Sequence, residues 1–249
     1  MQTHSSSHPP IKNQLLSALS REEYARLFPH LELFRLTKGD VLYEAGDTVK
    51  SSYFILNGVV SLLSTTEDGG IIEVAMVGNE GMVGLPAILG IHRTPYRIMV
   101  QIQGNAMKIK ADKLRGEFSR GGQLQEALLR YIHTLLTQIS QSAVCNYFHT
   151  VEQRLCRWLL MCRDRVRSNE IHITQEFISH MLGIPRTNVT MRAGILQRKS
   201  LIRYKHGKIT ILDPRGLENT SCECYRVVKE EMNTFRANQP ASDFFHSIV

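Results

Sequence analysis

The sequence lacks a long apolar run, and this argues against a membrane-spanning segment. The longest apolar stretches, such as Ile71–Val77, are short and interrupted by charge, whereas a helix that crosses a bilayer needs about 20 apolar residues. The N-terminal residues MQTHSSSHPP are polar, with no apolar core and no small-residue cleavage site, so no signal peptide is expected. We therefore expect a cytoplasmic protein with no membrane partner.

Cysteine is absent from the first 144 residues. An odd number of cysteines without an export signal favours reduced thiols over a disulfide framework. Two of them form the cluster Cys222-Glu-Cys224, but two thiols alone make an incomplete metal site. We therefore expect no metal site and favour a plain C-terminal tail over a redox or metal role. The cysteines are Cys145, Cys156, Cys162, Cys222 and Cys224.

The signatures of common catalytic sites are absent as well. The chain shows no set of nucleophile and base, no quartet of metal ligands and no glycine loop of the kind that cradles phosphate. The glycines between residues 78 and 90 belong to a strand-and-turn pattern instead. An enzyme is therefore not expected, and the remaining classes are binding proteins.

Residues 31–120 are predicted to form a small all-β domain. Short apolar runs alternate with turns made of Gly, Asn and Asp, a pattern typical of a barrel or jelly roll. The runs are Tyr53–Leu56, Val59–Leu63, Ile71–Val77 and Ile98–Ile102. The preceding residues 1–30 are expected to be a polar tail followed by short helices, one of them opened by the capping box Ser20–Glu23.

A long helix is predicted over residues 121–148. Its apolar residues recur at steps of three and four, and a stripe this narrow suits a seam between two helices. We therefore expect a dimerisation helix, and hence a homodimer, in preference to a helix packed within one chain. The seam residues are Leu124, Leu128, Tyr131, Leu135 and Ile139, while Ile132, Leu136 and Val144 are expected to face the helix's own domain.

A second capping box, Thr150–Gln153, begins another helix over roughly residues 151–166. The boundary to a C-terminal domain, residues 149–225, is therefore placed near residues 148–150. Residues 226–249 are expected to form the C-terminal tail.

Residues Thr174–Lys208 carry the pattern of a winged helix–turn–helix. Thr174 can cap a first helix, Gly183 permits a left-handed turn, and Pro185 suits the start of a second helix. The segments 201–204 and 209–212 then predict a β-hairpin with a basic tip. One position departs from the pattern, because Arg192 stands where such motifs bury an aliphatic side chain.

Positive charge is concentrated in the same segment. The chain carries a net charge of +7, and within residues 174–208 the only acidic residue is Glu176. This coincidence of charge and motif predicts double-stranded DNA as the partner, with protein contact by a winged helix as the weaker alternative. The expected DNA-binding residues are Thr174, Gln175, Arg186, Thr187, Asn188, Thr190, Met191, Arg192, Lys205 and Lys208.

From about residue 30 to 225, the order of these parts resembles the Crp/Fnr family of bacterial transcription regulators. The matching residues are Gly39-Asp40, Tyr53–Gly58, Asn79–Gly84, the break near Thr150 and Thr174–Val189. The resemblance implies an α+β chain with an N-terminal jelly roll of the cyclic-nucleotide-binding type, a long dimerisation helix and a C-terminal winged helix–turn–helix. It further implies a homodimer that binds a palindromic operator, with RNA polymerase as a candidate further partner.

The family's DNA-reading residues carry over unevenly. By resemblance, Arg186 matches a guanine-reading arginine and Thr174 matches a phosphate-contacting threonine. Thr187 stands where many members carry a cytosine-reading glutamate, and Met191 stands where the cyclic-AMP-responsive members carry a second arginine. The operator sequence is therefore not inherited with the fold.

The family's effector pocket also departs from the cyclic-AMP pattern. Gly84 is followed by Leu85-Pro86, where cyclic-AMP binders carry the glutamate that holds the ribose. We therefore predict that cyclic AMP is not the effector, and a cyclic-nucleotide-gated regulator of the same fold is the alternative. The candidate pocket residues are Gly84, Leu85, Arg93, Thr94, Arg97 and Ser140.

The sequence gives little support for the other cofactors with which members of this family sense their signals. An iron–sulfur cluster held by N-terminal cysteines is not expected, because no cysteine precedes Cys145. Haem is left as an alternative, with His30 and His92 as the histidines of the barrel region. The effector, the operator and the sign of regulation are not set by the sequence.

Overall fold

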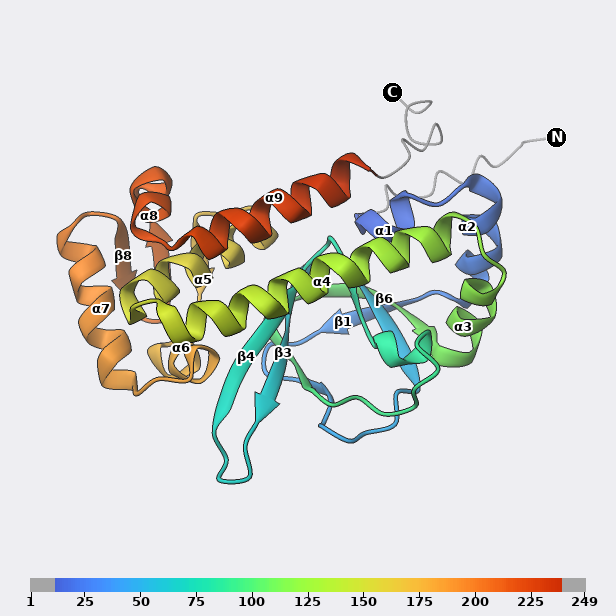
Figure 1. Cartoon of the computed structure of the whole chain (residues 1–249), viewed down its shortest axis with the longest axis horizontal. Helices are drawn as coiled ribbons and strands as arrows, with labels where there is room; N and C mark the ends of the chain where they lie inside the picture. Colours follow the sequence, from blue (N-terminus) through green and yellow to red (C-terminus); the bar gives the residue numbers. More distant parts are fainter. Residues whose placement is uncertain (1–11, 239–249) are drawn as a thin grey trace.

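The computed structural model describes residues 12–238. Figure 1 shows a β domain near one end of the molecule and a helical unit with a short sheet at the other. The long helix α4 (Gln123–Phe148) runs alongside both. The short elements α1 (Gln14–Ser17), α2 (Arg21–Leu27) and η1 (Phe28–His30) precede the β domain. The predicted capping box of α2 is confirmed, with both of its hydrogen bonds present.

The β domain is an antiparallel sheet with the strand order β1-β6-β3-β4, in which β2 pairs with β6 and β5 pairs with β3. This is the β domain that the strand-and-turn pattern predicts. Its elements are β1 (Glu32–Leu36), β2 (Val41–Tyr43), β3 (Ser51–Thr65), β4 (Ile71–Val77), β5 (Met82–Val83), η2 (Leu85–Ala87), β6 (Arg97–Lys110) and α3 (Ala111–Ser119).

Strand β3 differs from the sequence prediction of two separate strands. Asn57-Gly58 predicts a turn between two strands, yet β3 continues through both residues with shifts in its register. Gly58 has a φ of 87°, and a Cβ atom there would lie 2.6 Å from the Ile102 carbonyl oxygen. The side chain of Asn57 accepts a hydrogen bond from the Asn105 amide at 2.9 Å. The turn-prone pair therefore forms a bulge inside a long strand.

The packing of helix α4 also differs from the sequence prediction. The stripe predicted to be the dimer seam is buried within the chain: Leu124, Leu128, Tyr131 and Leu135 are all at most 6% exposed. Hydrophobic periodicity shows that a helix has an apolar face, but it does not say which neighbour covers that face. Within residues 12–238, no helix is both long and apolar enough to cross a membrane.

The C-terminal unit begins with α5 (Val151–Val166), whose bounds and capping box agree with the prediction. A small three-stranded sheet has the order β7-β9-β8. The remaining elements are β7 (Glu170–His172), α6 (Gln175–Leu182), α7 (Arg186–Arg198), β8 (Ile202–Lys205), β9 (Lys208–Ile211), α8 (Pro214–Thr220) and α9 (Glu223–Ala237).

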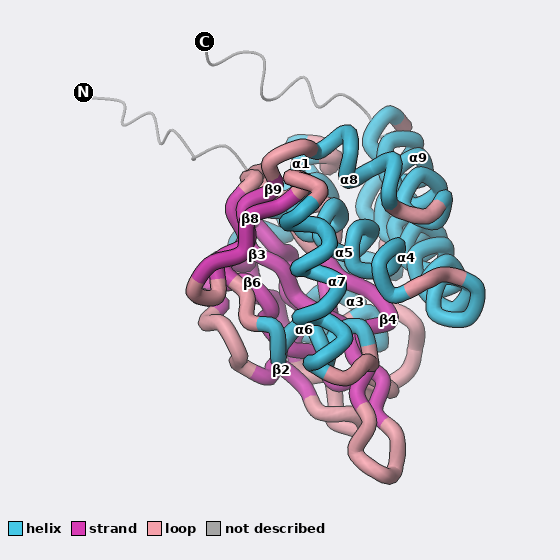
Figure 2. The backbone as a smooth tube through the Cα atoms, turned by 90° about the vertical axis from the view of Figure 1, so that its left-hand side faces the viewer, coloured by secondary structure: helices cyan, strands magenta, loops and turns pink. Residues whose placement is uncertain are grey.

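The tail expected from residue 226 is helical as far as Ala237, because it belongs to α9. Figures 1 and 2 show α9 lying alongside α4. The Phe235 ring reaches the core of the β domain, with its centroid 6.2 Å from that of Tyr131. The amphipathic α9 therefore packs along α4 and reaches the core of the β domain with Phe235, and residues 239–249 of the expected tail lie outside the described part of the chain.

The two halves of the molecule share a hydrophobic core. Val59, Leu63 and Met76 of the sheet belong to the same buried cluster as the helix–turn–helix. Helix α6 packs against β4, and a Cβ atom at Gly183 would lie 3.1 Å from Ile72. In this arrangement the C-terminal unit is docked on the β domain.

Candidate nucleic-acid interface and sensor cavity

Helices α6 and α7 form the predicted helix–turn–helix. Thr174 caps α6, since its hydroxyl accepts a hydrogen bond from the Phe177 amide at 3.2 Å. Gly183 ends the helix in the left-handed conformation with φ 60° and ψ 43°. Pro185 immediately precedes α7, whose Val189 and Leu196 are fully buried. The turn therefore positions α7 by burying one face of it.

The opposite face of α7 is open at its N-terminal half. Arg186, Thr187, Thr190 and Met191 are exposed, and Asn188 is half-buried. The Thr190 hydroxyl donates a hydrogen bond of 2.7 Å to the side chain of Gln175. This bond joins the beginning of α6 to the exposed face of α7, so the predicted residues of both helices form one surface.

The hairpin β8–β9 forms the predicted wing. Its turn is His206-Gly207, and both residues have positive φ, 49° and 73°, as a tight two-residue hairpin turn requires. The Ile173 amide donates a hydrogen bond of 2.7 Å to the Gly207 carbonyl, which ties the wing to the start of α6. Lys205 is exposed at the tip, and Lys208 forms an ion pair of 2.6 Å with Glu170.

Arg192 differs from the other predicted DNA-binding residues. Its guanidinium lies 3.9 Å from Glu152 of α5, which also pairs with Lys199 at 2.7 Å. A charged side chain thus takes the place of the usual aliphatic one because a carboxylate faces it. Arg192 already has a partner within the chain, and it joins α7 to α5.

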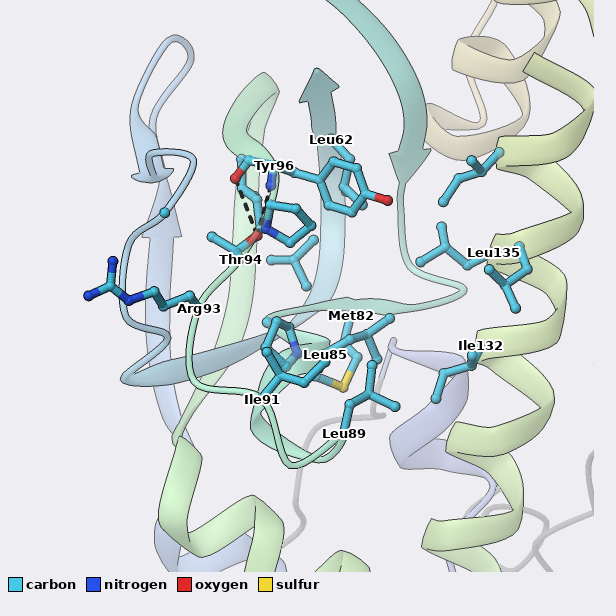
Figure 3. A pocket seen from close by; sticks show the side chains of 18 residues that line it. Leu62, Met82, Leu85, Leu89, Ile91, Arg93, Thr94, Tyr96, Ile132 and Leu135 are labelled. Atoms are coloured by element: carbon cyan, nitrogen blue, oxygen red, sulfur yellow. Dashed lines mark hydrogen bonds between the residues drawn. The ribbon is translucent and has the colours of Figure 1, made fainter. Parts of the chain in front are cut away.

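A cavity of about 560 Å³ lies between the sheet and α4 (Figure 3). Its walls are largely apolar, and among the described residues no histidine or cysteine lines it. The lining residues are Gly46, Leu62, Met82, Val83, Gly84, Leu85, Pro86, Leu89, Ile91, Arg93, Thr94, Pro95, Tyr96, Ile98, Ile132, Leu135, Leu136 and Ile139.

Four of the six predicted pocket residues, Gly84, Leu85, Arg93 and Thr94, line this cavity, and Arg97 and Ser140 do not. Figure 3 shows the Arg93 side chain pointing away from the apolar side chains. The buried Thr94 hydroxyl bonds locally, with the Tyr96 amide and carbonyl each at 3.2 Å. Arg97 pairs with Glu44 at 3.4 Å. Few polar or charged side chains are therefore free to contact a ligand in this cavity.

The apolar lining is broader than the predicted pocket. Leu62, Met82 and Ile91 also line the cavity, and they were not predicted because the candidate residues were taken from the positions at which relatives hold a nucleotide. The strand pattern marks such residues as buried, but it does not distinguish a side chain that fills a core from one that lines a cavity.

Comparison with known proteins agrees with this geometry. A cyclic nucleotide-binding domain matches residues 33–120, and a Crp-like helix-turn-helix domain matches residues 153–220. The chain belongs to the Crp/Fnr family of transcription regulators. It is accordingly a DNA-binding transcription regulator, and its family and fold are those of regulators rather than of enzymes.

Individual relatives of this Crp/Fnr regulator are distant. A global nitrogen regulator from Nostoc sp. is 22% identical over 196 residues, covering 75% of this chain and 86% of the relative. The structure of FixK2 from Bradyrhizobium japonicum is similar with a TM-score of 0.67 at 15% identity, covering 77% and 98% of the two chains. A CRP-family regulator from Thermus thermophilus has a TM-score of 0.62 at 18% identity, covering 76% and 96%.

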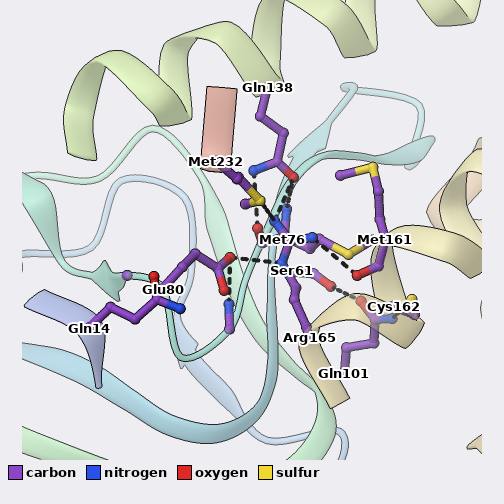
Figure 4. A network of polar contacts seen from close by, with 12 residues as sticks. Gln14, Ser61, Met76, Glu80, Gln101, Gln138, Met161, Cys162, Arg165 and Met232 are labelled. Atoms are coloured by element: carbon purple, nitrogen blue, oxygen red, sulfur yellow. Dashed lines mark hydrogen bonds and ion pairs between the residues drawn. The ribbon is translucent and has the colours of Figure 1, made fainter. Parts of the chain in front are cut away.

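A buried polar network joins the regulator's β domain to α5 (Figure 4). Arg165 of α5 forms an ion pair of 2.8 Å with Glu80, and both side chains are at most 3% exposed. The side chain of Gln138 on α4 lies 3.5 Å from Arg165 and forms hydrogen bonds of 3.1 Å with both backbone groups of Met76. The sheet, α4 and α5 therefore meet at one ion pair.

Glu73 of β4 lies in the same joint. It is buried, and it accepts a hydrogen bond of 2.9 Å from the indole of Trp158 in α5. The Ser61 hydroxyl lies 2.6 Å from Glu73 and 2.8 Å from Gln101. One hydroxyl has one proton, so it can donate to only one of them. A protonated Glu73 donates to Ser61, which then donates to Gln101.

Burial raises the pKa of Glu73 from 4.5 to about 7, against the opposing hydrogen bonds from Ser61 and Trp158. This direction agrees with the proton count, because with the Gln101 amide oriented toward Ser61 through its oxygen, the neutral acid satisfies every polar atom of the chain of hydrogen bonds. The Gln101 amide in turn donates to Cys162 of α5 at 3.0 Å. We therefore expect the joint between sheet and α5 to respond to the protonation of Glu73.

Proposed function

We propose that this regulator binds a palindromic operator as a homodimer, with one copy of α7 per subunit in the major groove. The observation that carries the proposal is the exposed N-terminal half of α7, flanked by the capped start of α6 and by the wing. Arg186 is suited to guanine, since a guanidinium can form two hydrogen bonds with its edge. Thr174, Lys205 and Lys208 are suited to the phosphates. RNA polymerase is a further proposed partner, and the cytoplasm is the proposed compartment.

The homodimer is supported by the exposed face of α4. Leu129 and Leu136 are 53% and 57% exposed and stand one heptad apart, and Tyr147 and Phe148 are 83% and 73% exposed. Val144, 39% exposed, lies between them. An apolar row of this kind on a long helix suits a second helix. The proposed seam thus lies on a different face of α4 from the one that the sequence periodicity suggested, and at Leu136 it borders the cavity.

We further propose that the effector is an apolar small molecule and not cyclic AMP. The cavity offers Leu85 and Pro86 where a ribose would need a carboxylate, and Pro86 has no backbone N–H to donate. Arg93 points away from the cavity. A nucleotide phosphate would therefore lose its charged partners, at a cost of about 1.5–3 kcal/mol for each hydrogen bond to a charged group.

DNA binding is tested with an operator selected from a random pool and measured by fluorescence anisotropy. Arg186→Ala should weaken operator binding by about 10- to 100-fold, the equivalent of 1–3 kcal/mol, and leave salt-sensitive non-specific binding in place. Arg120→Ala, on the segment after α3 and far from α7, is the matched control. Operator affinity that is unchanged by Arg186→Ala would contradict the assigned role. Transcription with purified RNA polymerase would then give the sign of regulation.

The effector proposal is tested by calorimetry and by displacement of an apolar fluorescent dye. Cyclic AMP should give no micromolar binding, whereas the dye should bind and Ile132→Trp, which fills the cavity, should abolish its binding. Leu33→Trp, at an exposed apolar position of β1, is the control. Micromolar cyclic-AMP binding would favour the alternative, a cyclic-nucleotide-gated regulator. Equal dye binding by both variants would show that the dye does not bind in the cavity and would contradict the proposed effector site.

A further inference from the structure

Three cysteines and a histidine from distant parts of the chain meet where α4 ends and α9 begins. Cys145 lies in the last turn of α4, and His149 is its C-cap. Cys222 is the N-cap of α9, and Cys224 lies in its first turn. One ligand atom from each, the three Sγ atoms and a ring nitrogen, lies within 4.8 Å of all the others.

The individual distances suit a tetrahedral metal ion. The Sγ atoms of Cys145 and Cys222 are 3.4 Å apart, and Cys224 Sγ is 3.6 Å from His149 Nδ1. With Zn–S near 2.3 Å and Zn–N near 2.0 Å, neighbouring ligand atoms of a tetrahedron are about 3.5–3.8 Å apart. The four groups therefore need little movement to surround a zinc ion.

The histidine is already oriented for such a role. Its Nε2 lies 3.2 Å from the carboxylate of Glu223, which leaves Nδ1 facing Cys224. In metal sites, a histidine ligand commonly donates its other ring N–H to a carboxylate, which fixes the ring and strengthens the ligand. Glu223 thus supplies the partner that a ligating His149 would need.

The surroundings suit a thiolate-rich site. All three cysteines are at most 4% exposed, and the His149 side chain is 11% exposed. Arg157, itself 8% exposed, places a buried positive charge near this cluster.

We propose that Cys145, His149, Cys222 and Cys224 form a closed, structural zinc site. Three thiolates and one imidazole are a ligand set that selects zinc, and four protein ligands leave no open position for catalysis. Binding releases the protons of the thiols to the solvent. Three thiolates around Zn²⁺ leave a net charge of −1, which Arg157 offsets.

The position of the site gives it a consequence for the regulator. His149 immediately precedes Thr150, the cap of α5, so the site holds the junction between the long helix and the DNA-binding unit. Zinc would clamp the start of α9 to this junction. The expectation of no metal site rested on counting Cys222 and Cys224 alone. The Cys145-x₃-His149 spacing, which places both residues one turn apart on a helix end, was the missed signal.

The test is metal analysis of the full chain, purified under reducing conditions without chelator. We expect about one zinc ion per chain, and a Co(II)-substituted protein with the absorption of a tetrahedral thiolate site. Cys145→Ser and Cys224→Ser should each reduce bound zinc to near zero. Cys156→Ser, a buried cysteine of α5 outside the cluster, is the matched control and should retain full zinc. Glu223→Gln should bind zinc about 10- to 100-fold more weakly.

If the serine variants fail to fold, the wild-type protein still decides the matter. Chelator should remove the zinc, lower the unfolding temperature and weaken operator binding, and added zinc should restore both. Three results would overturn the proposal: no zinc uptake by the fully reduced chain, equal zinc content in Cys145→Ser and Cys156→Ser, or a Cys145–Cys222 disulfide in a chain that takes up no zinc after reduction. If Arg186→Ala loses operator binding but retains zinc, DNA reading and zinc binding are independent, and each proposal can be tested without the other.

Discussion

Raising the pH from about 5 to about 8 should weaken the joint between the β domain and α5, and Glu73→Gln should remove this effect. Burial raises the pKa of Glu73 from 4.5 to about 7 in the folded protein. A carboxyl with such a raised pKa stabilises the folded state fully below 4.5, and this stabilisation is lost as the pH rises through 7. Deprotonation would also leave Ser61 with two acceptors for one proton.

The magnitude follows from the two pKa values. Their difference corresponds to about 3 kcal/mol, of which about 2 kcal/mol falls between pH 5 and pH 8. Glu73→Gln would keep the neutral pattern, since the amide that it introduces can donate to Ser61 and accept from Trp158. The variant should therefore lose this pH dependence while keeping most of the stability found at low pH.

Trp158 makes the assay direct, because it is the only tryptophan in the chain and its indole donates to Glu73. Its emission, followed between pH 5 and 8, should titrate near 7 in the wild type and stay flat in Glu73→Gln. Urea unfolding at both ends of the range should give the difference of about 2 kcal/mol. Glu67→Gln, at an exposed position, is the control. An identical pH response in wild type and Glu73→Gln would refute the reasoning.

Further predictions concern the ion pair, the dimer and the wing. Arg165→Met should lower the free energy of unfolding by about 3–5 kcal/mol in urea, since it leaves Glu80 buried without its partner; a smaller loss in Arg165→Met/Glu80→Gln would confirm that cause. Leu136→Asp should convert the dimer to a monomer in sedimentation, and a variant that remains a dimer would move the seam elsewhere. Gly207→Ala should strain the wing by about 1–2 kcal/mol through its positive φ and weaken operator binding, while leaving the zinc content unchanged; unaltered affinity would exclude the wing from the interface.

Much of the DNA-binding unit could be predicted because its signals are local. Capping at Thr150, the left-handed Gly183 and the polar start of α7 each depend on a few consecutive residues. The helix bounds of α5 and the hairpin turn at His206 could be predicted for the same reason. Arg192 shows the limit, since its ion partner Glu152 lies on another helix and spacing within α7 cannot reveal it.

Local residue patterns were enough to predict the helix–turn–helix and most of the helix starts, because caps, turns and periodicity act over one or two turns of chain, and the resemblance of these parts in their order predicted the family. Four features could be seen in the folded chain alone: the sheet buries the predicted stripe of α4, α9 packs along α4, the cavity beside α4 is apolar, and Cys145 and His149 lie next to Cys222 and Cys224. Each of these depends on contacts between residues far apart in the chain. A periodic pattern marks a side chain as apolar or polar, but packing decides what it meets.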